Sequence, residues 1–145
     1  MTCTFFGHRN TPKEVEPILI STLKDLIENK NVKNFYVGNH GDFDFLVIKT
    51  LKKLKIQYPN ISYSVVLAYL PQKKNVSDSL DFSLTIYPDG LEKVPYRLAI
   101  VKRNQWMIEH SDMAVVYVRN SFGGASQFKE FAEKRGKMVI NCFPE

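Results

Sequence analysis

The sequence predicts a three-layer α/β fold, with a mostly parallel sheet of about five strands and helices on both faces. Short apolar runs alternate with segments whose apolar residues recur every three or four positions, along almost the whole chain. The apolar runs also lack the in-and-out alternation of strands with one solvated face, which is typical of a buried parallel sheet. The 145 residues suit a single domain, which we assign to residues 1–145.

The predicted strands are five short apolar runs. Glycine, proline or polar residues that suit turns bound each of them. The run at 113–118 is apolar at every position, which indicates a strand covered on both faces. The five runs cover residues 2–6, 34–38, 62–67, 113–118 and 137–142.

The predicted helices fill the gaps between these strands. Their apolar residues lie three and four positions apart, which places them on one side of a helix. Gly136 follows the last helical segment and favours a helix end there. The helical segments cover residues 15–27, 42–58, 97–110 and 125–134.

Residues 71–96 follow neither pattern clearly. This segment contains three prolines and a polar stretch at 73–79. Within it, residues 83–87 are a candidate short strand before a turn at Pro88-Asp89-Gly90. Three interpretations of the segment stay open: a strand, a lid over a binding crevice and a partner surface.

The composition is that of an ordinary globular domain, with 44% hydrophobic and 24% charged residues. The net charge of +5 and the pI near 9.2 suit an anionic partner without identifying one. No apolar stretch approaches the roughly 20 residues that span a bilayer, and the N-terminus does not resemble a secretory signal. We therefore expect a cytoplasmic protein with no membrane partner.

The two cysteines, Cys3 and Cys142, lie in apolar runs near opposite ends of the chain. This placement predicts two buried thiols in a reducing compartment. A zinc site needs more ligands at close spacing than this sequence offers. We expect no metal and no other cofactor.

Small and polar residues gather where three of the predicted strands end, at residues 7–9, 38–42 and 120–126. In an open parallel sheet the carboxyl ends of the strands share one edge, and ligands bind there, where the strand order reverses. Glycine lets the backbone approach an anion, and the first N–H groups of a helix bind phosphate. We therefore expect a crevice of nucleotide size that accepts phosphate at this edge.

Several polar residues have two interpretations each. Arg103 lies inside a predicted helix, either on a solvated face or as a cation that reaches across the crevice to a phosphate. His8 and His40 are unpaired in the sequence, and a lone loop histidine is usually solvated or structural. The sequence contains no G-x-S-x-G nucleophile motif, no G-x-x-x-x-G-K-[ST] phosphate loop and no G-x-G-x-x-G dinucleotide motif. No standard enzyme chemistry is therefore singled out.

Several segments resemble the YpsA-like family of the SLOG superfamily, which includes the DprA/SMF and LOG proteins. Residues 103–112 (Arg-Asn-Gln-Trp-Met-Ile-Glu-His-Ser-Asp), the apolar strand after them and the pair Gly123-Gly124 are similar to that family. Residues 6–9 (Phe-Gly-His-Arg) and 38–44 resemble its first two loops. The resemblance spans nearly the whole chain. It implies a Rossmann-like domain that binds a nucleotide or a nucleotide-derived molecule at its glycine-rich loops.

On this resemblance we assign a ligand site. Its glycines and Ser126 would offer backbone and hydroxyl donors to phosphate, and Arg9 and Arg103 would supply charge. Asp44 and Asn104 would orient the ribose or the loops. The implied function is a binding module, a sensor or a sequestering domain for a nucleotide-derived small molecule. The predicted ligand-binding residues are Gly7, His8, Arg9, Gly38, Asn39, Gly41, Asp44, Arg103, Asn104, Gly123, Gly124 and Ser126.

A LOG-like nucleoside 5'-monophosphate N-glycosidase is the first alternative. That branch uses a motif of the form P-G-G-x-G-T-x-x-E, and residues 122–130 match its two glycines and its glutamate. Glu130 is therefore the candidate catalytic residue, or else an ordinary surface glutamate on a helix. The departures from the motif at Ser126 and Gln127 count against phosphate binding of the LOG kind.

DprA-like nucleic-acid binding is the second alternative, and it ranks last. The +5 charge favours it, but no basic stripe interleaved with aromatic residues accompanies that charge. We therefore do not expect nucleic acid as a partner. Related proteins often pair, so a homodimer is implied by the resemblance alone.

Overall fold

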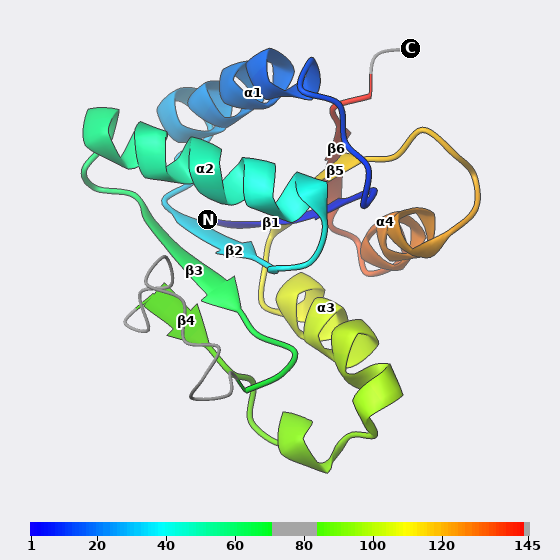
Figure 1. Ribbon diagram of the computed structural model, residues 1–145. Coiled ribbons are helices and arrows are strands. Elements are labelled where there is room, and N and C mark those ends of the chain that lie inside the picture. Colours follow the sequence, from blue (N-terminus) through cyan, green and yellow to red (C-terminus); the bar gives the residue numbers. More distant parts are fainter. Residues whose placement is uncertain (71–83, 144–145) are drawn as a thin grey trace.

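The computed structural model describes residues 1–70 and 84–143, which form a six-stranded sheet with helices against both faces (Figure 1). The strands are β1 (Thr2–Gly7), β2 (Asn34–Val37), β3 (Ser62–Val66), β4 (Thr85–Ile86), β5 (Met113–Tyr117) and β6 (Met138–Asn141). The α-helices are α1 (Val15–Asn29), α2 (Asp42–Gln57), α3 (Ala99–Glu109) and α4 (Gly124–Lys134). Two 3₁₀ turns, η3 (Leu91–Lys93) and η4 (Tyr96–Leu98), precede α3.

The predicted α/β class is confirmed, with one strand more than the five predicted. The additional strand is β4, which is two residues long and lies inside the segment whose pattern is ambiguous. It pairs with β3 at the edge of the sheet. It lies inside the candidate short strand at residues 83–87, and two residues are too few to show a period, so the sequence alone leaves this strand as one of several interpretations. The polar stretch at 73–79 lies outside the described residues.

All neighbouring strands run parallel, in the order β4-β3-β2-β1-β5-β6. From β1 the chain moves outward through β2, β3 and β4, and α3 then returns it to β5 on the other side of β1. The connections that follow β1 and β5 therefore leave the sheet in different directions. This is the arrangement that opens a ligand crevice beyond the carboxyl ends of two strands.

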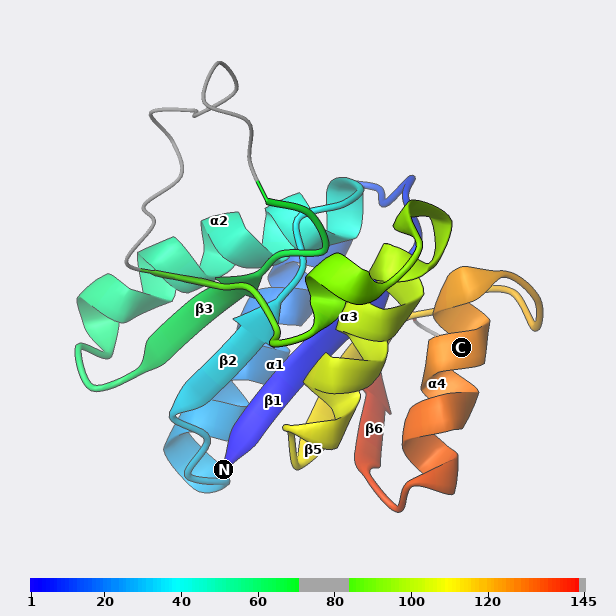
Figure 2. The same cartoon turned by 90° about the horizontal axis from the view of Figure 1, so that it is seen from below.

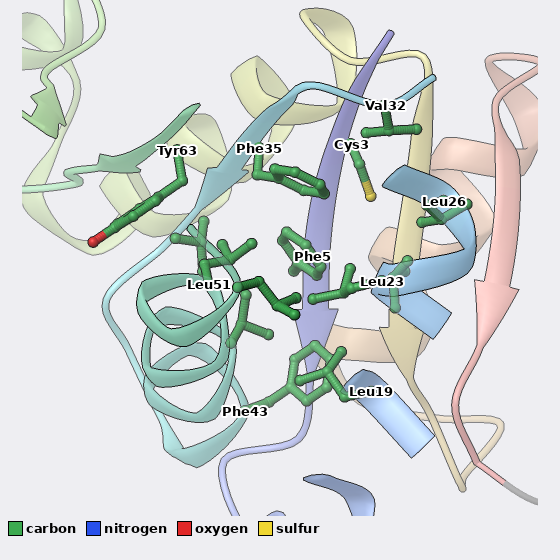
Figure 3. Close-up of a cluster of buried hydrophobic side chains, with 14 of the residues drawn as sticks. Cys3, Phe5, Leu19, Leu23, Leu26, Val32, Phe35, Phe43, Leu51 and Tyr63 are labelled. Carbon is green, nitrogen blue, oxygen red and sulfur yellow. The ribbon is translucent and has the colours of Figure 1, made fainter. Parts of the chain in front are cut away.

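The central strand β1 is covered on both faces because successive side chains of a strand point to opposite sides. Phe5 packs in the core formed with α1 and α2, and its ring lies 6.0 Å from that of Phe35 (Figure 3). Phe6 faces the other way, and its ring lies 5.4 Å from that of Phe128 in α4. Figure 2 shows α3 and α4 together on this second face. The two cores hold the end of β1 in a defined position.

The helices bury most of the apolar residues that their spacing predicts, such as Val15, Leu19, Leu23 and Leu26 in α1. The prediction is wrong for Ile18, Phe45, Leu98 and Val101, which are exposed because the buried side of each helix is narrower than its run of apolar residues. Helix α3 also buries two polar residues, Arg103 and Asn104. The functional site accounts for this burial.

Cys3 and Cys142 are buried and unpaired thiols, as predicted. Burial raises the pKa of both groups, so each packs as a small apolar side chain. In the described part of the chain, no helix has the length and apolar character needed to pass through a membrane.

Candidate functional site

A cleft of about 360 Å³ lies beyond the carboxyl end of β1, between the starts of α2 and α4 and one side of α3. This is the point at which the strand order reverses around β1. Four separate chain segments meet there. The lining residues are Phe5, Phe6, Gly7, His8, Arg9, His40, Asp44, Ile100, Arg103, Asn104, Gly124, Ala125 and Phe128.

Arg103, in the middle of α3, has only 1% of its surface exposed. Its Nε donates to Oδ1 of Asn104 at 2.7 Å, and its Nη1 donates to the carbonyl oxygen of Val66 at 2.9 Å. Nη1 also donates to Oδ1 of Asn39 at 3.4 Å, and Nη2 lies 3.3 Å from Nδ1 of His40. The interpretation of Arg103 as part of a solvated helix face is therefore wrong. Its guanidinium joins α3 to β3 and to the loop after β2.

Most of the donors of Arg103 are used within the protein. A guanidinium has five N–H groups, and four of them have the partners just named. The fifth, on Nη2, has no hydrogen-bond partner among residues 1–70 and 84–143. Arg103 thus retains one donor and its charge for a ligand, but not the two-pronged contact of a free arginine.

Asp44 lies in the first turn of α2, close to this guanidinium, with 8% of its surface exposed. Its Oδ2 accepts the backbone N–H of His40 at 3.0 Å. Burial raises the pKa of the Asp44 carboxyl to about 6, against the opposing effects of that hydrogen bond and of the charge on Arg103. Because Arg9 and Arg103 also line the cleft, its charge is positive and becomes more positive below about pH 6.

Gly38, at the end of β2, lets these two charged groups pack against the sheet. A Cβ at this position would lie 2.8 Å from Oδ2 of Asp44 and 3.0 Å from Cζ of Arg103. Any side chain would push the carboxylate or the guanidinium aside. Gly38 therefore serves the packing of Asp44 and Arg103.

His40 and His8 both line the cleft, and their partners define their tautomers. Nδ1 of His40 faces Nη2 of Arg103, which only donates, so Nδ1 accepts and Nε2 carries the proton. Nε2 of His8 accepts the backbone N–H of Arg119 at 2.9 Å, which places the proton on Nδ1 and links the loops after β1 and β5. Burial lowers the pKa of both imidazoles, and the nearby arginines lower it further. Both rings are therefore neutral at pH 7.

The start of α4 presents unpaired amides. Gly123 is its N-cap, with φ of +98°, and no side chain caps the helix. The N–H of Gln127 donates to the carbonyl oxygen of Gly123 at 3.1 Å, so the amides of residues 124–126 precede the first helical hydrogen bond. Apart from chain neighbours and the backbone of α4 itself, no described atom lies within 4 Å of where a Cβ on Gly123 or Gly124 would stand. The two glycines leave the positive end of the helix open.

The start of α2 is built differently. The N–H of Asp42 donates to the carbonyl oxygen of Arg9 at 2.8 Å, and the N–H of His40 donates to Asp44. The N-cap Gly41 has φ of +90°, and a Cβ there would lie 3.1 Å from Cα of Arg9. Acidic residues in this first turn repel an anion. This junction therefore contributes the side chains of His40 and Asp44 to the cleft, while the amides of His40 and Asp42 bind groups of the protein itself.

The predicted ligand residues divide into two groups. Five do not line the cleft. Gly38, Asn39 and Gly41 contact residues that do line it, Gly123 is the N-cap of α4, and Ser126 is buried in the first turn of α4. The other seven line the cleft: Gly7, His8, Arg9, Asp44, Arg103, Asn104 and Gly124.

Glu130, the candidate catalytic residue, is exposed and does not line the cleft. It follows Phe128, which does line the cleft, by two positions. Two residues rotate by about 200° around an α-helix, so Glu130 points away from the ligand side of α4. The structure does not bring it to the other predicted site residues.

The predicted ligand residues omit several that line the cleft. His40 belongs to the predicted junction at 38–42 and lies between Asn39 and Gly41, but a lone loop histidine is usually solvated or structural, so the sequence does not assign it. Helical spacing was a usable signal for two others. Ile100 precedes Asn104 by four residues, and Phe128 follows Gly124 by four, which puts each pair on one side of its helix.

A second hollow, of about 720 Å³, lies along α1. Its lining residues come from α1 and from Lys13 just before it, so it is the open side of a single helix and includes no strand end. As for metals, the described residues contain no group of three or more His, Cys, Asp or Glu side chains placed to hold an ion. The cleft is therefore the candidate site.

Comparison of the sequence with known families gives one match. The YpsA family model, described as the YspA SLOG family, matches residues 3–139. No curated protein matches the sequence.

Two solved structures share the fold. DNA processing protein A (DprA) from Streptococcus pneumoniae matches with a TM-score of 0.67 and 15% identity, over 97% of this chain and 49% of that one. DprA from Helicobacter pylori, described as having a unique single-stranded DNA binding mode, matches with a TM-score of 0.66 and 14% identity, over 97% of this chain and 64% of that one. At these identities the likeness shows the fold alone. This chain spans less than two thirds of either DprA chain.

These structures correct one prediction. From the sequence we did not expect nucleic acid as a partner, because the chain has no basic stripe. That exclusion is wrong, since the two solved chains just described are DNA processing proteins and one is described as binding single-stranded DNA. The physical reason is that helix amides and single arginines can hold phosphate without leaving a basic stripe in the sequence.

Proposed function

Because the chain belongs to the YpsA SLOG family, we propose that it binds the phosphate group of a nucleotide or of a nucleic acid in this cleft. The observation that carries the proposal is the start of α4, where the amides of 124–126 have no intrahelical partner and two glycines leave them open. Hydrogen bonds and the helix dipole together make such a helix start favourable for an anion. The chain then acts as a binding module, a sensor or a sequestering domain.

The charges of the cleft support an anionic ligand. Among the lining residues, Arg9 and Arg103 oppose the single carboxylate of Asp44. Arg103 is buried, so solvent and salt screen its charge less than they would at the surface. Its remaining Nη2 donor is available to a phosphate oxygen.

The size and the apolar walls of the cleft support a nucleotide in particular. Its volume falls in the usual range for small-molecule sites. Phe6, Ile100 and Phe128 contribute apolar surface beside the charged groups. A nucleotide, free or within a single strand, combines an apolar ring with a phosphate and so matches both kinds of surface.

Single-stranded DNA is the second candidate ligand, because one DprA structure is described as binding it. The net charge of +5 agrees with this possibility. Salt distinguishes the two ligands. Affinity for an oligonucleotide should fall steeply with salt because several phosphates release counterions, whereas affinity for a mononucleotide should fall less.

An N-glycosidase reaction would require an acidic group at the ligand. Glu130 lies outside the cleft, whereas Asp44 lines it and has a pKa of about 6, close to that of an effective proton donor. If nucleoside monophosphates release free base on incubation, loss of that release in Asp44→Asn and its retention in Glu130→Gln would identify the acid.

Titration calorimetry with AMP and with inorganic phosphate tests phosphate binding. Gly124→Ala adds a methyl group next to the open amides, where a Cβ meets no described atom and the backbone is not left-handed. We expect this variant to keep the melting temperature of the wild type and to bind AMP roughly tenfold more weakly. Lys129→Ala, on the same helix and outside the cleft, is the control. Equal affinity of Gly124→Ala and the wild type would contradict the site.

A further inference from the structure

Two tyrosines form an exposed aromatic pair near the cleft. The rings of Tyr69, just after β3, and Tyr96, in η4, are stacked with centroids 4.2 Å apart and planes 21° apart. The hydroxyl of Tyr69 donates to the carbonyl oxygen of Tyr96 at 3.0 Å. Tyr96 nevertheless has 76% of its surface exposed. One face of its ring is stacked, so the other face is available to a ligand.

One ring contact and the order of the chain place this pair beside the cleft. The ring of Tyr69 meets that of His40 edge-on at 6.0 Å, and His40 lines the cleft. Tyr96 lies in η4, which continues directly into α3, four positions before Ile100, and Ile100 also lines the cleft. Figure 2 shows the start of α3 at the end of the sheet where β1 and β2 finish.

Among the described residues, the stack on Tyr69 accounts for only one face of the Tyr96 ring. The hydrogen bond that connects the two segments uses the backbone carbonyl of Tyr96, so any residue at this position could accept it. The ring itself buries little surface. A large aromatic side chain held by a second ring, with one face open, is the usual form of a stacking surface for a nucleobase.

We propose that Tyr96, supported by Tyr69, stacks on the base of the nucleotide whose phosphate lies at the start of α4. This inference rests on the proposed function and assigns the base to one side of the same cleft. We call the Tyr96–Tyr69 pair the platform. Stacking uses the π-face that every base has, so the platform accepts different bases. The base belongs either to a free nucleotide or to a single-stranded nucleic acid.

Binding of three probes to Tyr96→Ala tests the platform: AMP, ribose 5-phosphate and a ten-nucleotide oligo-dT. We expect Tyr96→Ala to weaken AMP binding about 5- to 150-fold, and to leave ribose 5-phosphate binding unchanged because that probe has no base. Tyr96→Phe should bind AMP like the wild type. Phe45→Ala, which removes an exposed ring outside the cleft, is the control. Circular dichroism and thermal unfolding verify that each variant folds.

The outcomes separate the platform from the phosphate site. If ribose 5-phosphate binds and Tyr96→Ala binds AMP and oligo-dT like the wild type, the platform is wrong while the proposed function stands. Phe122 carries an exposed ring just before the start of α4. If Phe122→Ala, and not Tyr96→Ala, weakens AMP binding, the base lies on that ring and the platform is also wrong. If no probe binds the wild type, the proposed function fails. If Tyr96→Ala loses affinity for AMP, the platform binds free nucleotides. If it loses affinity for oligo-dT alone, the platform binds single-stranded nucleic acid.

Discussion

Nη1 of Arg103 donates a hydrogen bond to the carbonyl oxygen of Val66 at 2.9 Å, across 37 positions of sequence. Val66 is the last residue of β3, and Arg103 lies in the middle of α3. Helix α3 leads the chain back across the sheet. This hydrogen bond fixes α3 to the edge of the sheet at which the strands have their carboxyl ends. The wall of the cleft depends on this one guanidinium.

Replacement of Arg103 should destabilise the fold. Arg103→Met removes the partners of the Val66 carbonyl and of two asparagine amides, and it leaves Asp44 without a nearby cation. We expect a loss of roughly 3–5 kcal/mol in the free energy of unfolding, measured by urea denaturation. Lys102→Met, at the exposed neighbouring position, should change it by less than about 0.5 kcal/mol. A loss below about 1 kcal/mol for Arg103→Met would argue against this role.

Gly7 should tolerate no side chain, because a Cβ there would overlap the ring of Phe43. We expect Gly7→Ala to cost about 1–3 kcal/mol in the free energy of unfolding. In the background of Phe43→Leu the same substitution should cost less, since the ring is gone, and a double-mutant cycle measures the difference. Equal costs in both backgrounds would show that the contact is not responsible.

The stability contributed by Asp44 should depend on pH. Its pKa rises from 3.8 to about 6 on folding, so the folded state binds the proton more tightly. The residue stabilises the fold below its unfolded pKa, and this contribution is lost as the pH rises through about 6. The free energy of unfolding of Asp44→Asn, measured by urea denaturation relative to that of the wild type, should therefore increase by roughly 2 kcal/mol between pH 4 and pH 8. His8 and His40 titrate in both proteins, so the difference isolates Asp44; a constant difference would contradict the raised pKa.

The same carboxylate should make anion binding tighter in acid. Protonation of Asp44 removes the negative charge beside Arg103. Cyclic AMP is a suitable probe because the charge of a phosphodiester is constant between pH 5 and pH 8. We expect its affinity to rise roughly tenfold from pH 8 to pH 5, and to rise less in Asp44→Asn. Parallel pH profiles for the two proteins would assign the effect to the histidines instead.

Glu130 should have no influence on the ligand. It is exposed on the side of α4 that faces away from the cleft. Glu130→Gln should bind AMP with the wild-type affinity, within about twofold, in the calorimetric titration that tests Gly124→Ala. A larger change would mean that the ligand extends around α4.

Local patterns in the sequence were sufficient for most of the fold. Apolar runs identified five of the strands, and helical spacing identified α1 to α4, because burial of one side imposes a period that is visible in a single segment. The alternation of these segments then predicted the parallel sheet and the edge at which loops such as 7–9 and 124–125 meet. The two-residue strand β4 carried no such period.

Only the tertiary structure decided what each polar residue does at that edge. It buried Arg103, turned Glu130 away, and left the amides at the start of α4 without a helical partner, while at the start of α2 the amide of Asp42 binds the Arg9 carbonyl. Its hydrogen bonds connect residues far apart in the chain, such as His8 and Arg119 across 111 positions. Periodicity reports only which side of an element is apolar. Whether a donor is satisfied depends on which distant atoms the assembled sheet brings within 3 Å or so of it.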